Sequence, residues 1–385
     1  MLDYVEYGGG KDALERVRDE WKTLQARSIS LTPFGTWEWN KAWHTHLGRE
    51  SELRVLRFYH RLTHETVGIA PLCVTRLHRL PLRQLTWMGA GVSDYHEPIT
   101  LPGYEDVVAD ALLRVLDRGG SDWEIADLAQ IREGSALSER TPRPFPHRPA
   151  AAQTVLTTEP CPYIVLPPTW DAYAATLGKK MRSNLGYYDR LLFRTFPDAK
   201  IILADESTHE EGVNALFRLH QARWNARLLP GALGGQTVRL FHRNVAQELL
   251  SAGLLRLHLL YADGDYRAAL YCFATGGKTF YYLGGFSPDY AKYSLGTVLT
   301  SHAIRAAIKE GHTEFDFLRG AQEYKLRWTP YSRMNCRLLL RNSTGGVGKR
   351  TLGNAGVVVH KLERELTTRA KAFAETQGRK RQGEV

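Results

Sequence analysis

The feature that most constrains this chain is a partial repeat of its first half in its second half. Trp87-Met88-Gly89 corresponds to Tyr282-Leu283-Gly284, and Asp94-Tyr95 corresponds to Asp289-Tyr290 at the same offset. A hairpin-like pair of β-rich segments precedes each copy, and a helical pattern follows each. The parallel order of these elements carries more weight than the few identities. We interpret the sequence as two tandem copies of one α/β unit.

Composition is typical of a globular protein with a basic surface. The 385 residues leave room for two or three domains. Hydrophobic residues make up 43% and charged residues 24%, which excludes a mainly disordered, fibrous or disulfide-scaffolded chain. A net charge of +10 favours anionic partners such as phosphates, nucleotides or nucleic acid. The alternative is an ordinary basic surface with no specific partner.

The spacing of the cysteines and the residues at the N-terminus indicate whether a metal site and a secretory signal are to be expected. Cys73, Cys161, Cys272 and Cys336 form no CxxC pair, so neither a zinc ribbon nor a disulfide framework is predicted. The first residues lack the basic and apolar regions of a secretory signal. No apolar run approaches the ~18 residues of a membrane span. We therefore expect a cytoplasmic protein with no metal and no integral membrane segment.

Hydrophobic periodicity predicts alternating helices and strands along both halves. Helices are expected at residues 11–27, 34–47, 105–118, 169–196, 210–229, 237–253, 294–310 and 357–376. Strands are expected at residues 51–62, 66–80, 83–91, 123–128, 200–206, three times within 254–287, and at 312–320 and 334–342. The Pro- and Arg-rich residues 133–153 predict an irregular connection between the halves.

The segment 279–328 holds the densest chemical information. A predicted strand ends at Gly284-Gly285, and a helix begins near Ser294. The first amides of a helix lack intrahelical partners and lie at the positive end of its dipole, which favours a phosphate or pyrophosphate. Lys292 could add a positive charge beside this helix start, and the glycines could let the strand bend or let a ligand approach the backbone closely. The alternative is an ordinary strand–turn–helix with Ser294 as N-cap.

This segment resembles the GNAT acyltransferase superfamily. It looks most like the BioF2-like or cellulose-biosynthesis-type acetyltransferase branch, which is related to the Fem-type peptidoglycan aminoacyltransferases. The resemblance covers about 160–350 well and is weaker over 20–130. It implies two GNAT-like units, each with a mixed, mostly antiparallel sheet flanked by helices. We expect an N-terminal unit at 1–155, a catalytic unit at 156–350, and a C-terminal helix and charged tail at 351–385.

The resemblance implies a donor site for acyl-CoA between splayed strands, with the pyrophosphate at the helix start. The residues expected there are Gly284, Gly285, Phe286, Lys292, Tyr293, Ser294, Leu295, Gly296, Thr297 and Val298. Tyr293 and Val298 replace the Gln or Arg and the Gly or Ala of the usual superfamily pattern. This departure keeps a second hypothesis open, namely a non-catalytic member that binds an anionic ligand or a partner protein.

Direct acyl transfer needs a base for the acceptor and an acid for the leaving thiolate. Asp316 or Glu323 is predicted as the base and Tyr324 as the acid. Asp316 lies among apolar neighbours, where the pKa of a carboxyl can rise. Arg319 or Lys325 would bind an anionic part of donor or acceptor. Alternatively, Asp316 is a structural carboxylate paired with Arg319 or a backbone amide, and Lys325 is plain surface charge.

The acceptor side is predicted from polar clusters elsewhere in the chain. Asp94, Tyr95 and His96 follow the glycine-ended strand of the first half, Arg182 lies on a basic helix face, and Trp224 precedes a Gly/Pro loop. The alternatives are a capped turn, a solvated helix face and a core tryptophan.

Together these features predict an enzyme that moves an acyl group, most simply acetyl, from acyl-CoA to an amine or hydroxyl. By resemblance the acceptor is a small molecule such as a sugar nucleotide, an amino-acid-like molecule or a cell-envelope or polysaccharide precursor. An aminoacyl-tRNA-dependent Fem-type transferase is the second enzymatic hypothesis, and no DNA partner is expected.

Overall fold

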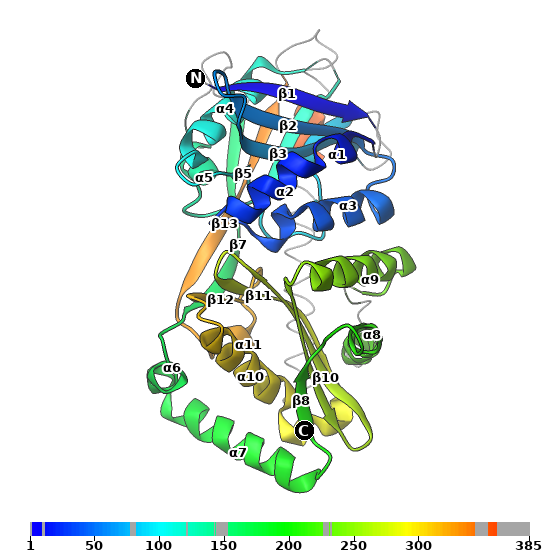
Figure 1. The fold of residues 1–385 in the computed structure, drawn as a ribbon, viewed down its shortest axis with the longest axis vertical. Coiled ribbons are helices and arrows are strands. Elements are labelled where there is room, and N and C mark those ends of the chain that lie inside the picture. The colour runs from blue at the N-terminus through cyan, green and yellow to red at the C-terminus, as the bar shows by residue number, and fades with distance from the viewer. Residues whose placement is uncertain are drawn as a thin grey trace.

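One long mixed sheet runs through both halves of the chain (Figure 1). The computed structural model describes residues 2–9, 12–77, 82–120, 122–141, 143, 153–225, 231, 233–342 and 353–359. The strands are β1 (Leu2–Gly9), β2 (Glu52–His60), β3 (Thr66–Arg76), β4 (Arg83–Trp87), β5 (Ile99–Thr100), β6 (Ile125–Arg132), β7 (Gln153–Val165), β8 (Lys200–Leu203), β9 (Leu255–Ala262), β10 (Asp265–Thr275), β11 (Lys278–Phe286), β12 (Glu314–Asp316) and β13 (Ser332–Arg341). Their order is β1-β2-β3-β4-β6-β13-β7-β12-β11-β10-β9-β8, and β5 pairs with β3.

The strand order repeats when the sheet is followed inward from its two ends. From one end it is β1-β2-β3-β4-β6-β13, and from the other it is β8-β9-β10-β11-β12-β7. The parallel pairs also correspond, because β4 pairs with β6 and β11 pairs with β12, whereas the other pairings are antiparallel. The prediction of two repeated units with mixed, mostly antiparallel sheets is therefore confirmed.

The two halves exchange a strand at the centre of the sheet. β7 follows β6 in the sequence but pairs with β12 and β13, and β13 follows β12 but pairs with β6 and β7. Each half therefore completes the sheet of the other. The domain boundary predicted between residues 155 and 156 falls within β7, and the division into 1–155, 156–350 and 351–385 stays a prediction. Residues 353–359 are helical, and the rest of the tail lies outside the described residues.

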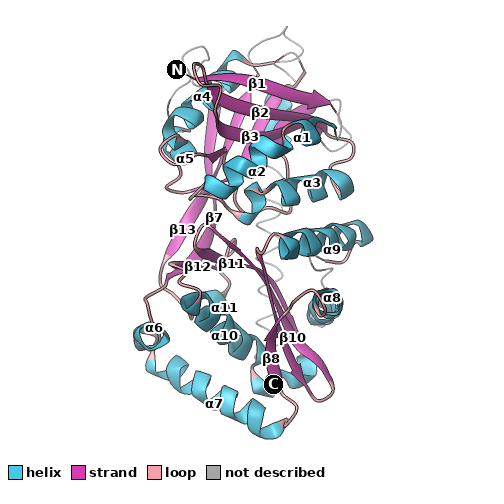
Figure 2. Ribbon diagram, viewed as in Figure 1, coloured by secondary structure: helices cyan, strands magenta, loops and turns pink. Residues whose placement is uncertain are grey.

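Helices cover both faces of the sheet (Figure 2). The α-helices are α1 (Asp12–Arg16), α2 (Arg18–Arg27), α3 (Trp37–His46), α4 (Glu105–Arg118), α5 (Ala136–Arg140), α6 (Trp170–Thr176), α7 (Lys179–Thr195), α8 (His209–Asn225), α9 (Gln236–Ser251), α10 (Leu295–Lys309) and α11 (Glu323–Leu326). Two 3-10 helices, η1 (Pro33–Gly35) and η3 (Pro288–Tyr293), precede α3 and α10. Contacts between α3 and α9 join the halves on one face.

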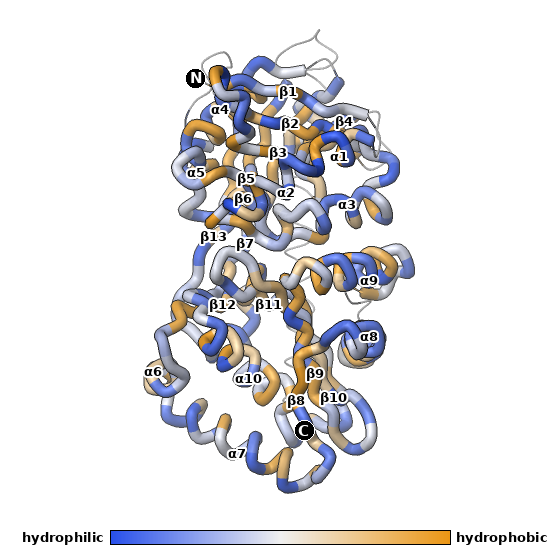
Figure 3. The backbone as a smooth tube through the Cα atoms, viewed as in Figure 1, coloured by the Kyte–Doolittle hydropathy of each residue, from blue (hydrophilic) through white to orange (hydrophobic). Residues whose placement is uncertain are grey.

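The second half has a hydrophobic core on each side of its sheet. On β10, Tyr271 and Phe273 face the core that includes α8 and α9, whereas Leu270 and Cys272 face the core under α7 and α10. Figure 3 shows apolar residues concentrated on β9 and β10. Full burial of one such large apolar side chain contributes about 1.5–3 kcal/mol. These two cores hold the strand β11 and the start of α10 in fixed positions.

Most predicted elements are present, with shifted ends. The helix predicted at 169–196 is two helices, because the backbone of Leu177 is extended between α6 and α7. The strand predicted at 312–320 ends at Asp316, since Leu318 has a positive φ of 58° that leaves the extended region. β1 and β7 were not predicted, and the structure assigns both as paired strands.

Candidate active site

The strands β11 and β12 separate shortly after they begin to pair. Their parallel pairing covers three residue pairs and ends where Phe280 faces Asp316. β12 stops there, whereas β11 continues to Phe286. A bulge in the β10–β11 pairing next to Tyr282 bends β11 further. Beyond Asp316 the two chain segments therefore diverge, with α10 beginning after the end of β11.

Asp316 is a buried carboxylate at the point of divergence. Its side chain is fully buried, and its Oδ1 accepts a hydrogen bond from the Leu318 amide at 2.7 Å. Its Oδ2 accepts a hydrogen bond from the Tyr95 hydroxyl at 2.8 Å and lies 3.7 Å from Arg333. Burial raises the pKa of Asp316 to about 6, although Arg333 and these hydrogen bonds favour the charged form. Near neutral pH this carboxyl group can therefore take up or release a proton.

A loop of the first half docks against the end of β12. Asp94 and Tyr95 belong to this loop, and Asp94 pairs with the side chain of Arg319. The Asn335 amide donates to the Asp94 carbonyl at 2.9 Å, and the Tyr282 hydroxyl donates to the Val92 carbonyl at 2.7 Å. The structure thus brings Asp94, Tyr95, Asp316 and Arg319 together between the two halves. The alternative partner considered for Asp316, a backbone amide, is present, but Arg319 pairs with Asp94 instead.

Lys325 also lies close to the end of β12. Its side chain is buried, so the alternative that Lys325 is plain surface charge is wrong. Its ammonium group donates hydrogen bonds to the carbonyls of Leu318, at 3.4 Å, and Arg319, at 2.6 Å. Burial lowers the pKa of Lys325 to about 8, although Asp94 and Asp316 favour its charged form. Lys325 therefore fixes the strained turn after β12 and places a cation near Asp316.

The two other predicted catalytic side chains differ in exposure. Tyr324 is half-buried, with its ring centroid 6.5 Å from that of Tyr281. The Glu323 side chain is 85% exposed and pairs with Arg327 one turn along, at 2.8 Å. Of the two carboxylates predicted as alternative bases, the structure places only Asp316 in the cluster with Tyr95 and Lys325.

The start of α10 is shaped by its neighbours in β11. Ser294 is the N-cap in a left-handed conformation with φ of 49°, and its hydroxyl lies 3.0 Å from that of Thr297. Leu295 and Gly296 are the first two helical residues, whose amides have no intrahelical acceptor. A side chain on Gly296 would meet the Phe286 ring at 3.3 Å. Phe286 therefore lines one side of the helix start.

The space over the two glycines of β11 is occupied by protein. A Cβ at Gly285 would lie 2.5 Å from the backbone nitrogen of His220 on α8, and one at Gly284 would lie 2.5 Å from the Tyr281 hydroxyl. Of the two predicted reasons for these glycines, bending of the strand and close approach of a ligand, the second is corrected: Gly285 allows α8 to pack on β11. Lys292 is exposed, and its ammonium lies 4.9 Å from the centre of the buried Tyr293 ring.

Three predicted acceptor residues, His96, Arg182 and Trp224, have packing or hydrogen-bond contacts within the protein. His96 is buried and stacks on Trp87, and burial lowers its pKa to about 3. Arg182 donates to the carbonyls of Ala175 and Leu177 and so caps the end of α6. Trp224 donates to the His220 ring at 2.9 Å near the end of α8. Each of these side chains thus has a structural contact, and their binding roles stay predictions.

Two residues of this site were missed by sequence reasoning. Arg333 on β13 pairs with Glu314 at 2.7 Å and approaches Asp316, and Asn335 holds the Asp94 carbonyl. β13 brings both residues to the site, because it pairs with β7 at Arg333 and with β6 from Asn335 onward. The strand exchange has no local sequence signal that could have placed them there.

Residues 179–326 match the Acetyltransf_6 family, which is described as an acetyltransferase (GNAT) domain. This segment is therefore similar to GNAT acetyltransferase domains. The matched segment runs from α7 to α11 and includes the divergence of β11 and β12, the start of α10, Asp316 and Lys325. The predicted family resemblance is confirmed for this segment. No curated protein matches the chain in sequence.

Solved structures share the fold at low sequence identity. FemX superposes with a TM-score of 0.62 and 10% identity, covering 83% of this chain and 95% of that chain. A conserved protein of unknown function from Bacteroides thetaiotaomicron VPI-5482 gives a TM-score of 0.54 and 10% identity, with 84% and 97% covered. These similarities extend over both halves, so the two-unit fold is shared along most of the chain.

Two further observations concern membrane-spanning helices and metal ligands. Within the described ranges, no helix is long and apolar enough to cross a membrane. In the same part of the chain, no three His, Cys, Asp or Glu side chains are grouped so that they could hold a metal ion.

Proposed function

We propose that this chain transfers an acyl group from acyl-CoA to an amine or hydroxyl of a small acceptor. The GNAT domain at 179–326 supports an acyltransferase. The observation that carries the proposal is the position of Asp316, buried with a pKa of about 6 where β11 and β12 separate. A base with a pKa near the working pH is effective in removing a proton from an acceptor.

In this proposal the donor lies between the diverging ends of β11 and β12. Its pyrophosphate would contact the amides of Leu295 and Gly296 at the start of α10, because those of Thr297 and Val298 already donate to the Ser294 carbonyl, and Lys292 would add positive charge. The half-buried Gly296 and Thr297 lie at this helix start. The thioester would then lie toward Asp316 and Tyr324.

The proposed reaction is a direct transfer. The acceptor nitrogen or oxygen attacks the thioester carbonyl carbon, a new C–N or C–O bond forms, and the C–S bond breaks. The acceptor proton goes to Asp316, with the Tyr95 hydroxyl as a relay because it already donates to Oδ2. The departing thiolate takes a proton from Tyr324. Arg319 and Lys325 position this machinery, since Arg319 binds Asp94 and Lys325 holds the carbonyls after β12.

The test compares variants of the two candidate bases. Asp316→Asn is expected to bind acetyl-CoA like the wild type. Its turnover should be at least ~100-fold lower, because a general base typically accelerates a reaction by this factor or more. Glu323→Gln is expected to retain turnover, because its carboxylate is exposed. Release of free thiol from acetyl-CoA, measured across a set of amines, amino sugars and sugar nucleotides, reports the reaction. Wild-type turnover in Asp316→Asn would refute the assignment.

Thermal shift separates the alternative functions, because a ligand that binds only the folded state raises the melting temperature. The acyl-CoA proposal expects a shift with acetyl-CoA and with CoA. A shift with aminoacyl-tRNA alone would favour the Fem-type hypothesis. A shift with CoA but no thiol release for any acceptor would favour the non-catalytic binding module. A polysaccharide or cell-envelope role for the acceptor rests on the family resemblance.

A further inference from the structure

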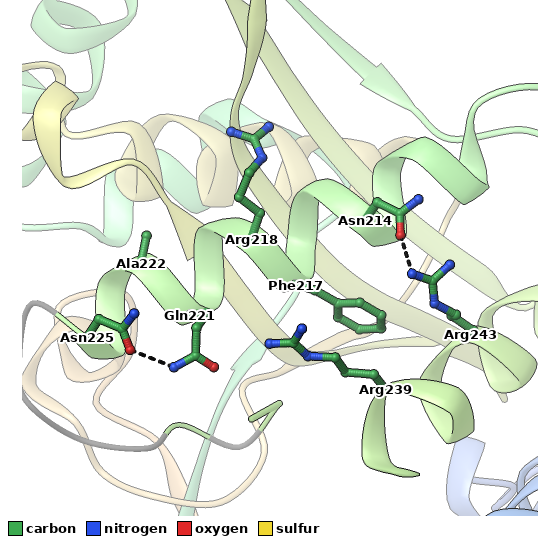
Figure 4. A pocket seen from close by; sticks show the side chains of 8 residues that line it. All are labelled: Asn214, Phe217, Arg218, Gln221, Ala222, Asn225, Arg239 and Arg243. Atoms are coloured by element: carbon green, nitrogen blue, oxygen red, sulfur yellow. Dashed lines mark hydrogen bonds between the residues drawn. The ribbon is translucent and has the colours of Figure 1, made fainter. Parts of the chain in front are cut away.

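A second site candidate is a groove between α8 and α9, on the outer side of the second half. The groove encloses about 440 Å³, within the range of small-molecule sites. Phe217 forms part of its lining, with Arg218 and Asn214 from α8 and Arg239 and Arg243 from α9. Figure 4 shows Arg239 and Arg243 extending from α9 beside the Phe217 ring, whereas Arg218 points away from them.

Neutral groups hold the two arginines of α9 in place. The Arg239 Nε donates to the Leu233 carbonyl at 2.7 Å, and the Arg243 Nη2 donates to the Asn214 side-chain oxygen at 2.5 Å. Both guanidinium groups also lie against Phe217, at 5.9 Å and 5.6 Å from its ring centre. These contacts fix the orientation of both groups but leave their positive charges uncompensated.

The distribution of carboxylates supports the same conclusion. Arg218 pairs with Asp265 at 2.8 Å. In the portion of the chain that the structure describes, neither Arg239 nor Arg243 forms an ion pair with a carboxylate. The two arginines lie one turn apart on α9, where like charges repel each other. A cluster of oriented guanidinium groups without acidic partners is the arrangement that binds phosphate oxygens, since the planar fork matches their geometry.

We propose that the α8–α9 groove binds the phosphate group of a phosphorylated small molecule of about sugar-phosphate size. Arg239 and Arg243 bind the phosphate oxygens, and the remaining volume toward Gln221 and Asn225 takes the polar body of the ligand. These two side-chain amides hydrogen bond to each other at 2.7 Å on the far side of the groove. This site is separate from the donor cradle at α10, and binding here does not depend on acyl transfer.

The experiment is calorimetric titration of the full chain with glucose 6-phosphate and pyrophosphate, with glucose as the uncharged probe. The variant Arg239→Gln with Arg243→Gln is expected to weaken binding of both phosphates at least about tenfold, because two charge-assisted contacts are lost. The matched control is Arg114→Gln with Arg118→Gln, two exposed arginines at the same spacing on α4, and it should bind like the wild type. Glucose should not bind detectably.

A second variant keeps both charges and therefore separates binding from folding. Asn214→Ala removes only the acceptor that orients Arg243, so we expect weaker phosphate binding with unchanged net charge. Four results would overturn the proposal. The first three are no binding of either phosphate to the wild type, equal binding to the Arg239/Arg243 variant, and tight binding of a short RNA without binding of glucose 6-phosphate. Loss of binding in Thr297→Glu alone would assign the phosphate to α10 and also refute the proposal.

Discussion

Ionisation of Asp316 should make the protein less stable as the pH rises, and the variant Asp316→Asn should remove this dependence. The pKa of this carboxyl rises from 3.8 to about 6 on folding, so the folded state holds the proton more tightly than the unfolded chain. Its contribution to stability is therefore fully present below pH 3.8 and is lost as the pH rises through about 6.

The magnitude follows from the size of the shift. About two pKa units correspond to ~3 kcal/mol in total, and on the order of 1 kcal/mol of this is lost between pH 5 and pH 8. Asparagine keeps the shape of the side chain. Its oxygen can accept from the Leu318 amide, and its NH2 group can donate to the Tyr95 hydroxyl. The uncharged variant is therefore expected to be at least as stable as the wild type at pH 8.

The assay is urea unfolding of wild type and Asp316→Asn at several pH values from 5 to 8. The difference between their free energies of unfolding should change by on the order of 1 kcal/mol over this range, in favour of the variant at high pH. Glu323→Gln, which removes an exposed carboxylate, is the control and should follow the wild type. Parallel curves for Asp316→Asn and the wild type would show that the ionisation of Asp316 does not change differently in the folded and unfolded states over this range, and would refute the reasoning.

Three further predictions concern the donor cradle, the pH profile and the packing of β11. Thr297→Glu should weaken acetyl-CoA binding at least about tenfold, because the new carboxylate in the first turn of α10 repels a pyrophosphate. The melting temperature should not fall, because an acidic residue in the first turn of a helix is stabilising. Unchanged affinity for acetyl-CoA in titration calorimetry would exclude this cradle. Turnover should fall as the pH drops through about 6, where Asp316 becomes protonated. Tyr95→Phe should lower turnover because the relay hydroxyl is lost, and it should move the acidic limb of the pH profile upward by roughly one pH unit, since loss of a hydrogen bond disfavours the charged form of Asp316. Wild-type turnover with an identical pH profile would contradict the relay. Gly285→Ala should destabilise the fold by ~1–3 kcal/mol in urea unfolding, because its Cβ would meet the α8 backbone; full stability would show that α8 shifts easily.

Local hydrophobic patterns and turn residues in the sequence were sufficient to predict β11, α10 and β12. Residues of α10 repeat with helical spacing, and Gly311 follows the helix as expected. The same reasoning placed Asp316 opposite Phe315 and Phe317, and the structure buries the two rings in the core under α10. These features depend on neighbouring residues only, so a single sequence contains them.

Long-range contacts could not be predicted in this way. β7 contains Pro160 and Pro162, which argue against a strand with neighbours on both sides. Their carbonyls nevertheless accept hydrogen bonds from Gly320 and Phe317, on the side where the chain leaves β12. The pairing of Arg319 with Asp94 likewise joins residues from different halves. A single sequence holds no signal for such pairs.

The exchange of β7 and β13 has a consequence for synthesis of the chain. The first half exposes the edge of β6 until β13, which ends at Arg341, has left the ribosome. An open strand edge is a template for wrong pairing between nascent chains. Truncation before Ser332 would leave that edge open permanently, so a shortened protein should aggregate even though every residue of β1 to β6 is present.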